Sequence, residues 1–143
     1  MQTDHQTAQD PVVARIRALV RDTHSLLQAD GRELGLAYPE EPPPPGQPFP
    51  DPSPAIAKMR EHLQALRTAV LAQSGGPAGA SARELTALTL LETDQSLEKL
   101  AQSYAAPDPA SATELRGESV RLVKQAKSTS VKAGNALGIP WPL

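Results

Sequence analysis

The stretch "IAKMREHLQALRTAV", residues 56–70, places apolar side chains at alternating spacings of three and four residues. Because an α-helix completes a turn every 3.6 residues, these side chains share one face, and the Lys, Arg, Glu and Gln between them share the other. Ser53-Pro54 supplies an N-cap and a favoured first residue, and "SGGPAG" at 74–79 ends the pattern. The stretch therefore predicts an amphipathic helix that must bury one face. Its stripe is Ile56, Met59, Leu63, Leu66 and Val70.

Three other stretches carry the same periodicity. The first helix is predicted from Asp10-Pro11 to Gly31, with one further turn through Leu34 and Leu36 as the alternative. The third is predicted from a capping box at residues 81–84, and the fourth from a second capping box at residues 111–114 to Gly138. Short connections should make the last three helices alternate in direction. Four amphipathic helices predict an all-α four-helix bundle.

The predicted core stripes of these three helices differ in composition. The fourth helix carries small residues, which allow a neighbouring helix to approach closely. The stripes are Val12, Val13, Ile16, Leu19, Val20, Thr23, Leu26 and Leu27 in the first; Leu85, Leu88, Leu91, Leu97, Leu100 and Tyr104 in the third; and Leu115, Leu122, Ala126, Ala133 and Leu137, with Val120, Val123 and Val131 beside them, in the fourth.

Length and composition indicate one domain. A chain of 143 residues suffices for a single core, and Leu and Ala dominate its aliphatic content. It contains no cysteine, which excludes disulfides and thiolate chemistry and favours a cytoplasmic protein. No apolar run is long enough for a membrane span, so no membrane association is expected. Residues 1–9 are polar and are predicted to be a disordered N-terminus.

The segment "PEEPPPPGQPFPDPSP", residues 39–54, is the least ordinary part of the sequence. In an extended polyproline conformation, about fifteen residues reach about 45 Å. The following helix of about nineteen residues is about 28 Å long. Residues 39–53 are therefore predicted to strap the bundle as a long crossover that delivers the second helix parallel to the first. A displayed ligand for another protein is the alternative.

Charge is distributed unevenly along the chain. The net charge is −2, yet residues 110–143 hold five Lys or Arg against two Glu. Arg121, Lys124 and Lys132, with Ser128, follow helical spacing and form a basic stripe. Pairing with the acidic side of the third helix, formed by Glu92, Asp94 and Glu98, or simple solvation of the stripe, is favoured over nucleic-acid contact, which is judged unlikely.

Residue patterns for metal, cofactor or catalytic chemistry are weak. The three histidines, His5, His24 and His62, lack the Glu-x-x-His pairs of di-metal bundles, so no metal site is expected. The loop before the third helix lacks the Lys-Ser/Thr of a phosphate-binding loop. No cofactor and no catalytic residue are therefore assigned.

One short stretch suggests an enzymatic alternative. In "RALVRDTH", six residues separate Arg17 from His24. This spacing is similar to the Arg-x(4–6)-His element of HEPN-type helical-bundle ribonucleases. The resemblance implies cleavage of an RNA phosphodiester, with His24 in acid–base work and Arg17 on developing negative charge.

The C-terminal segment "GIPWPL" carries the single tryptophan. Trp141 either caps its own bundle or docks on a partner, and Phe49 in the proline-rich segment faces the same choice. Phe49, Trp141 and Leu143 are thus the candidate partner-binding residues. The sequence favours a non-enzymatic protein-interaction module, such as an adaptor, chaperone-like or regulatory subunit, and leaves a homo-oligomer open.

Overall fold

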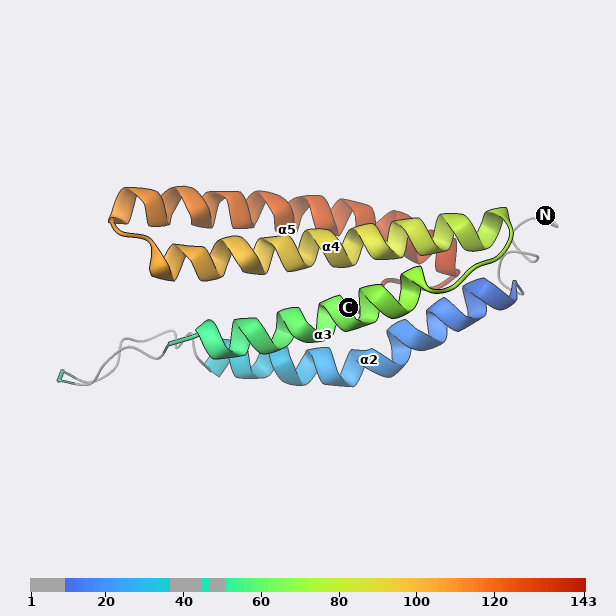
Figure 1. Ribbon diagram of the computed structural model, residues 1–143, viewed down its shortest axis with the longest axis horizontal. Helices are drawn as coiled ribbons and strands as arrows, with labels where there is room; N and C mark the ends of the chain where they lie inside the picture. Colours follow the sequence, from blue (N-terminus) through green and yellow to red (C-terminus); the bar gives the residue numbers. More distant parts are fainter. Residues whose placement is uncertain (1–9, 37–44, 47–50) are drawn as a thin grey trace.

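The computed structural model describes residues 10–36, 45–46 and 51–143, and among these residues helices are the only regular secondary structure. The four helices are α2 (Pro11–Leu36), α3 (Ser53–Leu71), α4 (Pro77–Ala105) and α5 (Pro109–Leu137). They pack together as two helical hairpins, α2–α3 and α4–α5 (Figure 1). Helix α4 contacts both α3 and α5 along its length, whereas α2 reaches α5 only weakly. The predicted all-α four-helix bundle is confirmed.

The direction of the second helix differs from the prediction. Three side-chain contacts join the two segments. Asp30 and Glu33 of α2 contact His62 and Lys58 of α3, and Arg15 of α2 contacts Gln73, just after the end of α3. Residue numbers fall along one partner as they rise along the other, so α2 and α3 are antiparallel (Figure 1). The predicted parallel arrangement is wrong.

The connection between α2 and α3 therefore starts and ends at the same end of the bundle. The cost of closing a loop grows slowly with its length, so a long connection permits a crossover without requiring one. Most of the predicted strap, residues 39–44 and 47–50 with Phe49, lies outside the described residues, as do residues 1–9. Its packing against the bundle stays a prediction. Where the description resumes, Pro52 is fully buried at the start of α3.

Helix starts are set by residues placed directly before proline. The Asp10 carboxylate accepts from the amides of Val12 and Val13, and Asp108 accepts from the amide of Ser111 at 2.7 Å. Gly76 precedes Pro77 at the start of α4. The predicted capping boxes at residues 81–84 and 111–114 lie inside helices and do not start them. Pro at the first helical position outweighed them, because its fixed φ is preorganised for a helix.

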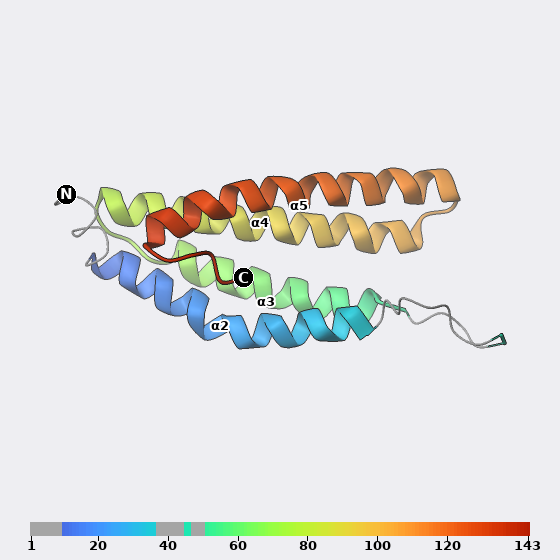
Figure 2. The same ribbon diagram turned by 180° about the vertical axis from the view of Figure 1, so that it is seen from behind.

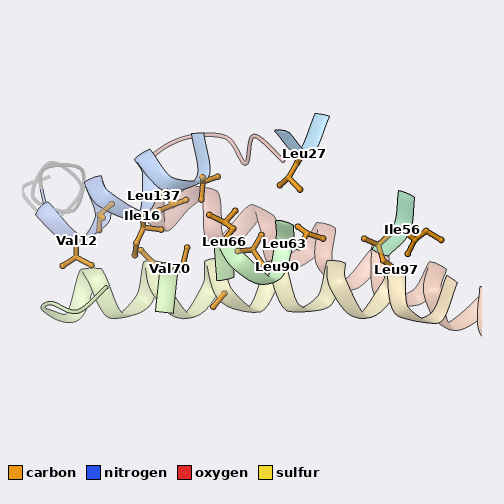
Figure 3. Packing of buried hydrophobic residues seen from close by; sticks show 14 residues of the cluster. Val12, Ile16, Leu27, Ile56, Leu63, Leu66, Val70, Leu90, Leu97 and Leu137 are labelled. Carbon is orange, nitrogen blue, oxygen red and sulfur yellow. The ribbon is translucent and has the colours of Figure 1, made fainter. Parts of the chain in front are cut away.

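The core is aliphatic and lies between the two hairpins (Figure 3). Ile16, Ile56, Val70 and Leu137 are completely buried; α2 and α5 contribute one each and α3 contributes two. Helix α2 continues past the predicted stop at Gly31 to Leu36. The remaining large members of this cluster are Val12, Val13, Val20, Leu27, Leu63, Leu66, Leu90 and Leu97.

The third predicted stripe is rotated in the structure. Leu88 and Tyr104 are 44% and 38% exposed, whereas Thr86 and Thr89 are buried beside Leu90. Helix α4 lies between two neighbours, so its buried surface covers a wide arc that includes polar residues. Apolar periodicity finds one face of a helix and misses the second when small polar residues form it. In the first stripe, Leu26 is likewise exposed.

Among the described residues, no helix has the length and apolar character needed to cross a membrane.

Candidate functional site: the C-terminal tail and the groove beneath it

The chain reverses direction at the end of α5 through a glycine-dependent turn. Gly138 adopts a left-handed conformation with φ of 74°, and the amide of Ile139 donates to the carbonyl of Gly134 at 3.1 Å. A Cβ at Gly134 would lie 2.7 Å from the Ile139 carbonyl oxygen and 3.1 Å from the Trp141 amide nitrogen. Two glycines therefore let the last residues fold back across the final turn of α5.

The tail, residues 138–143, then lies on the bundle (Figure 2). Ile139, Trp141 and Leu143 are partly buried and pack against the aliphatic core. In Figure 2 the tail leaves α5 and crosses in front of α3, between α5 and α2. Of the two alternatives for Trp141, the structure has the ring capping its own bundle.

A recess of about 310 Å³ remains between the end of the tail and the helices below it. Its apolar lining comes from α2, α3, α4 and the tail. Three polar side chains, His24, Gln28 and Thr93, complete it. No lining side chain is Asp, Glu, Lys or Arg. The apolar and tail residues are Leu27, Met59, Leu63, Leu90, Trp141, Pro142 and Leu143.

Arg17 and His24 both turn toward this end of the chain. The Arg17 guanidinium Nε donates to the carbonyl of Leu137 at 2.9 Å, which ties α2 to the last turn of α5. A cation is favourable there, because the final carbonyls of a helix lack helical partners and carry partial negative charge. His24 lines the recess, and its Nδ1 is buried without a hydrogen-bond partner. The structure thus places both residues of the ribonuclease-like motif against the tail or its turn.

The predicted basic stripe is solvent-exposed. Arg121, Lys124 and Lys132 lie on the outer face of α5, and within the described part of the chain no ion pair joins them to an acidic side chain. Of the two favoured outcomes, pairing with the acidic side of α4 is therefore wrong, and the stripe is solvated. The one ion pair across α4 and α5 among the described residues has the opposite polarity, Lys99 with Glu118 at 3.3 Å.

The acidic residues of α4 face the other hairpin instead. Asp94 receives hydrogen bonds from Arg60 at 2.9 Å and from Gln64 at 3.2 Å, both on α3, and Glu98 lies 3.3 Å from Arg60. Hydrogen bonding to the Asp94 carboxylate raises the pKa of Arg60 above its ordinary value, against the opposing effect of desolvation. Glu92 is 3% exposed, and neither of its carboxylate oxygens has a partner. The wide buried arc of α4 explains why Asp94 and Glu98 contact α3 and not the basic stripe of α5.

A partly buried contact between α2 and α3 was also missed. His62 Nδ1 contacts the carboxylate of Asp30, whose side chain is 1% exposed. The sequence predicted no partner for either residue. A signal existed, because Asp30 lies three residues after Leu27 and so continues the buried side of α2.

Among the described residues, no group of His, Asp or Glu is arranged to hold a metal ion. Of the candidate partner-binding residues, Trp141 and Leu143 line the recess, whereas Phe49 lies outside the described residues. Searches with this chain found no matching family model, no similar curated protein and no similar solved structure. The candidate functional site is therefore the tail together with the groove beneath it, which residues of α2, α3 and α4 form.

Proposed function

We propose that this protein is a non-enzymatic protein-interaction module whose α2–α3–α4 groove binds short, proline-flanked aromatic segments. One observation carries this proposal: the chain's own Trp141, Pro142 and Leu143 lie on the groove as a bound peptide would. The prolines lower the entropy lost on docking, and tryptophan is enriched among interface residues that dominate binding energy. An equivalent segment from a partner would compete with the tail for the same surface.

Binding in trans tests the proposal. The full-length Trp141→Ala variant should free the groove while leaving every helical residue in place. A fluorescein-labelled peptide of sequence GIPWPL should then bind saturably, with fluorescence anisotropy as the measurement. The same peptide with alanine for tryptophan is the control. Absence of saturable binding to the folded variant would contradict the proposal.

The ribonuclease alternative makes a different demand on the same residues. Arg17 donates to the Leu137 carbonyl and His24 lies beneath the tail, so an RNA phosphate would have to displace the end of the chain to reach both. We therefore expect purified protein to leave a mixed-sequence RNA intact on a denaturing gel. Cleavage that His24→Ala abolishes would replace the binding proposal with the enzymatic one.

The absence of cysteine supports a cytoplasmic setting, and the net charge of −2 supports a protein partner over nucleic acid. The identity of that partner is not specified by the groove.

A further inference from the structure

We infer that the recess beside the docked tail is a binding site for a small, neutral aromatic molecule carrying one hydroxyl or similar hydrogen-bonding group. The inference requires the docked tail and is independent of whether partner peptides use the groove. It concerns space that the tail leaves unfilled, and it names a different class of ligand.

The size of the recess favours a small molecule as the occupant. A volume of about 310 Å³ is at the small end of the range for small-molecule pockets, roughly 300–1,000 Å³. The tail forms one wall through Trp141, Pro142 and Leu143 and so limits the space left for a ligand. A ligand of one ring fits this space.

The lining also selects against charged ligands. None of its side chains carries a permanent charge, and leucines from α2, α3 and α4 supply much of the wall. An ionised ligand would lose its hydration without gaining a counter-charge from a lining side chain, which disfavours its binding. A neutral ligand avoids that loss.

Two neighbours favour an aromatic ring over an aliphatic one. The Trp141 indole and the Met59 thioether both line the recess. Aromatic rings associate favourably in offset or edge-to-face arrangements, and sulfur makes favourable contacts with ring edges. Because the two side chains come from the tail and from α3, a ring between them would contact both.

His24 supplies the reason for a hydrogen-bonding group. Its ring lines the recess, and within the described part of the chain its Nδ1, which is closed off from solvent, has no hydrogen-bond partner. A ligand hydroxyl at this imidazole can donate or accept, so it suits either tautomer. Gln28 and Thr93 extend the polar side of the recess.

The chain contains built-in reporters for a binding experiment on the intact protein. Its two methionines are Met1 and Met59, and Trp141 is its single tryptophan. We expect p-cresol to shift the 13C-methyl signal of Met59 and the indole N–H signal of Trp141 saturably. Met1 is the internal control and should not move. If p-cresol leaves the Met59 and Trp141 signals in place up to its solubility limit, the inference is overturned.

Matched variants locate the site. Thr93 lines the recess, Thr113 is exposed on α5, and each donates its hydroxyl to the carbonyl four residues earlier. Thr93→Phe should fill the recess and weaken p-cresol binding at least tenfold, whereas Thr113→Phe should leave it unchanged. Equal weakening by both, or by neither in folded protein, would contradict the assignment. Helical content and a cooperative thermal transition establish folding of each variant.

Ligand chemistry provides a second criterion that survives if Thr93→Phe fails to fold. Toluene lacks the hydroxyl and should bind about two- to tenfold more weakly than p-cresol, the range expected for one hydrogen bond. The difference should vanish in His24→Leu. The anion 4-methylbenzoate should bind at least tenfold more weakly than p-cresol. A preference for the anion, or an unchanged p-cresol advantage in His24→Leu, would overturn the proposed ligand class.

Discussion

The α4–α5 hairpin packs by different chemistry in two regions: an aliphatic core near the end of α5, shared with the other helices, and a polar contact in its middle, between α4 and α5 themselves. Toward the end of α5, Ile16, Val70 and Leu137 are fully buried in an aliphatic core shared by all four helices. In the middle of the hairpin, Ser96 and Ser119 are buried, and each hydroxyl donates to the other residue's carbonyl, at 3.0 and 2.8 Å. Aliphatic burial contributes most of the stability and has no direction, whereas the serine pair contributes less but fixes the register of α4 on α5.

The largest effect should come from the aliphatic end. Leu137→Ala removes a completely buried side chain, and we expect a loss of about 2–5 kcal/mol in the free energy of unfolding, measured by urea denaturation. Val131→Ala on the same helix, 64% exposed, should change stability by less than about 0.5 kcal/mol. Similar losses in both variants would show that the core is not where the structure has it.

The turn that docks the tail can be broken without touching the core. Gly134→Ala should push the tail off the bundle, because overpacking of about 1–3 kcal/mol exceeds the gain in helix propensity. Trp141 emission should shift to the red and become accessible to quencher. Gly117→Ala is the control on the same helix. Apart from its chain neighbours and its own helix backbone, no atom lies within 4 Å of a Cβ added at Gly117. This substitution should therefore stabilise the protein by about 0.5–1 kcal/mol. A shielded, blue-shifted Trp141 in Gly134→Ala would refute the close approach.

A smaller effect is expected at the serine pair. Ser119→Ala removes one hydrogen bond to the Ser96 carbonyl and should cost about 0.5–1.5 kcal/mol in the free energy of unfolding. Ser128→Ala, exposed on the same helix, corrects for the difference in helix propensity between the two residue types. If the two variants unfold at the same denaturant concentration, the hydrogen bond of Ser119 makes no net contribution to the free energy of unfolding.

The smallest effect is local and depends on pH. The hydrogen bond from the Ser111 amide, and to a lesser extent the one from its hydroxyl, lowers the pKa of the Asp108 carboxyl below its ordinary value of 3.8. A carboxyl whose folded pKa is depressed stabilises the folded state above its unfolded pKa and loses that contribution as the pH falls through the folded pKa. Protection of the Ser111 amide from hydrogen exchange, corrected for the intrinsic pH dependence of exchange, should therefore decrease as the pH is lowered below 3.8. Asp108→Asn keeps an N-cap and should abolish this dependence.

Local sequence determined the helices themselves. The apolar stripe of α3 was predicted residue by residue, and Ile56, Leu63, Leu66 and Val70 are all buried. Asp10-Pro11 was predicted to begin the first helix and does so. These features depend on periodicity and on hydrogen bonds between residues that are close in the chain, so no distant partner is needed to read them.

Tertiary structure decided the direction of α3 and the roles of the buried polar residues. A long connection leaves direction open, because its length bounds the distance it can span without specifying it. Asp30, Asp94 and Ser96 are buried because of which helices surround them, and a single sequence does not state those neighbours.

The recess has the same origin. The tail's composition marked Trp141 as an anchor, and Gly138 marked the turn, but the groove is assembled from α2, α3 and α4. His24 and Met59 are 35 residues apart in the chain, and only packing brings them to one surface. Sequence by itself determined the helices and the anchor; tertiary packing decided what the anchor covers, because a cavity is a property of side chains that meet across helices.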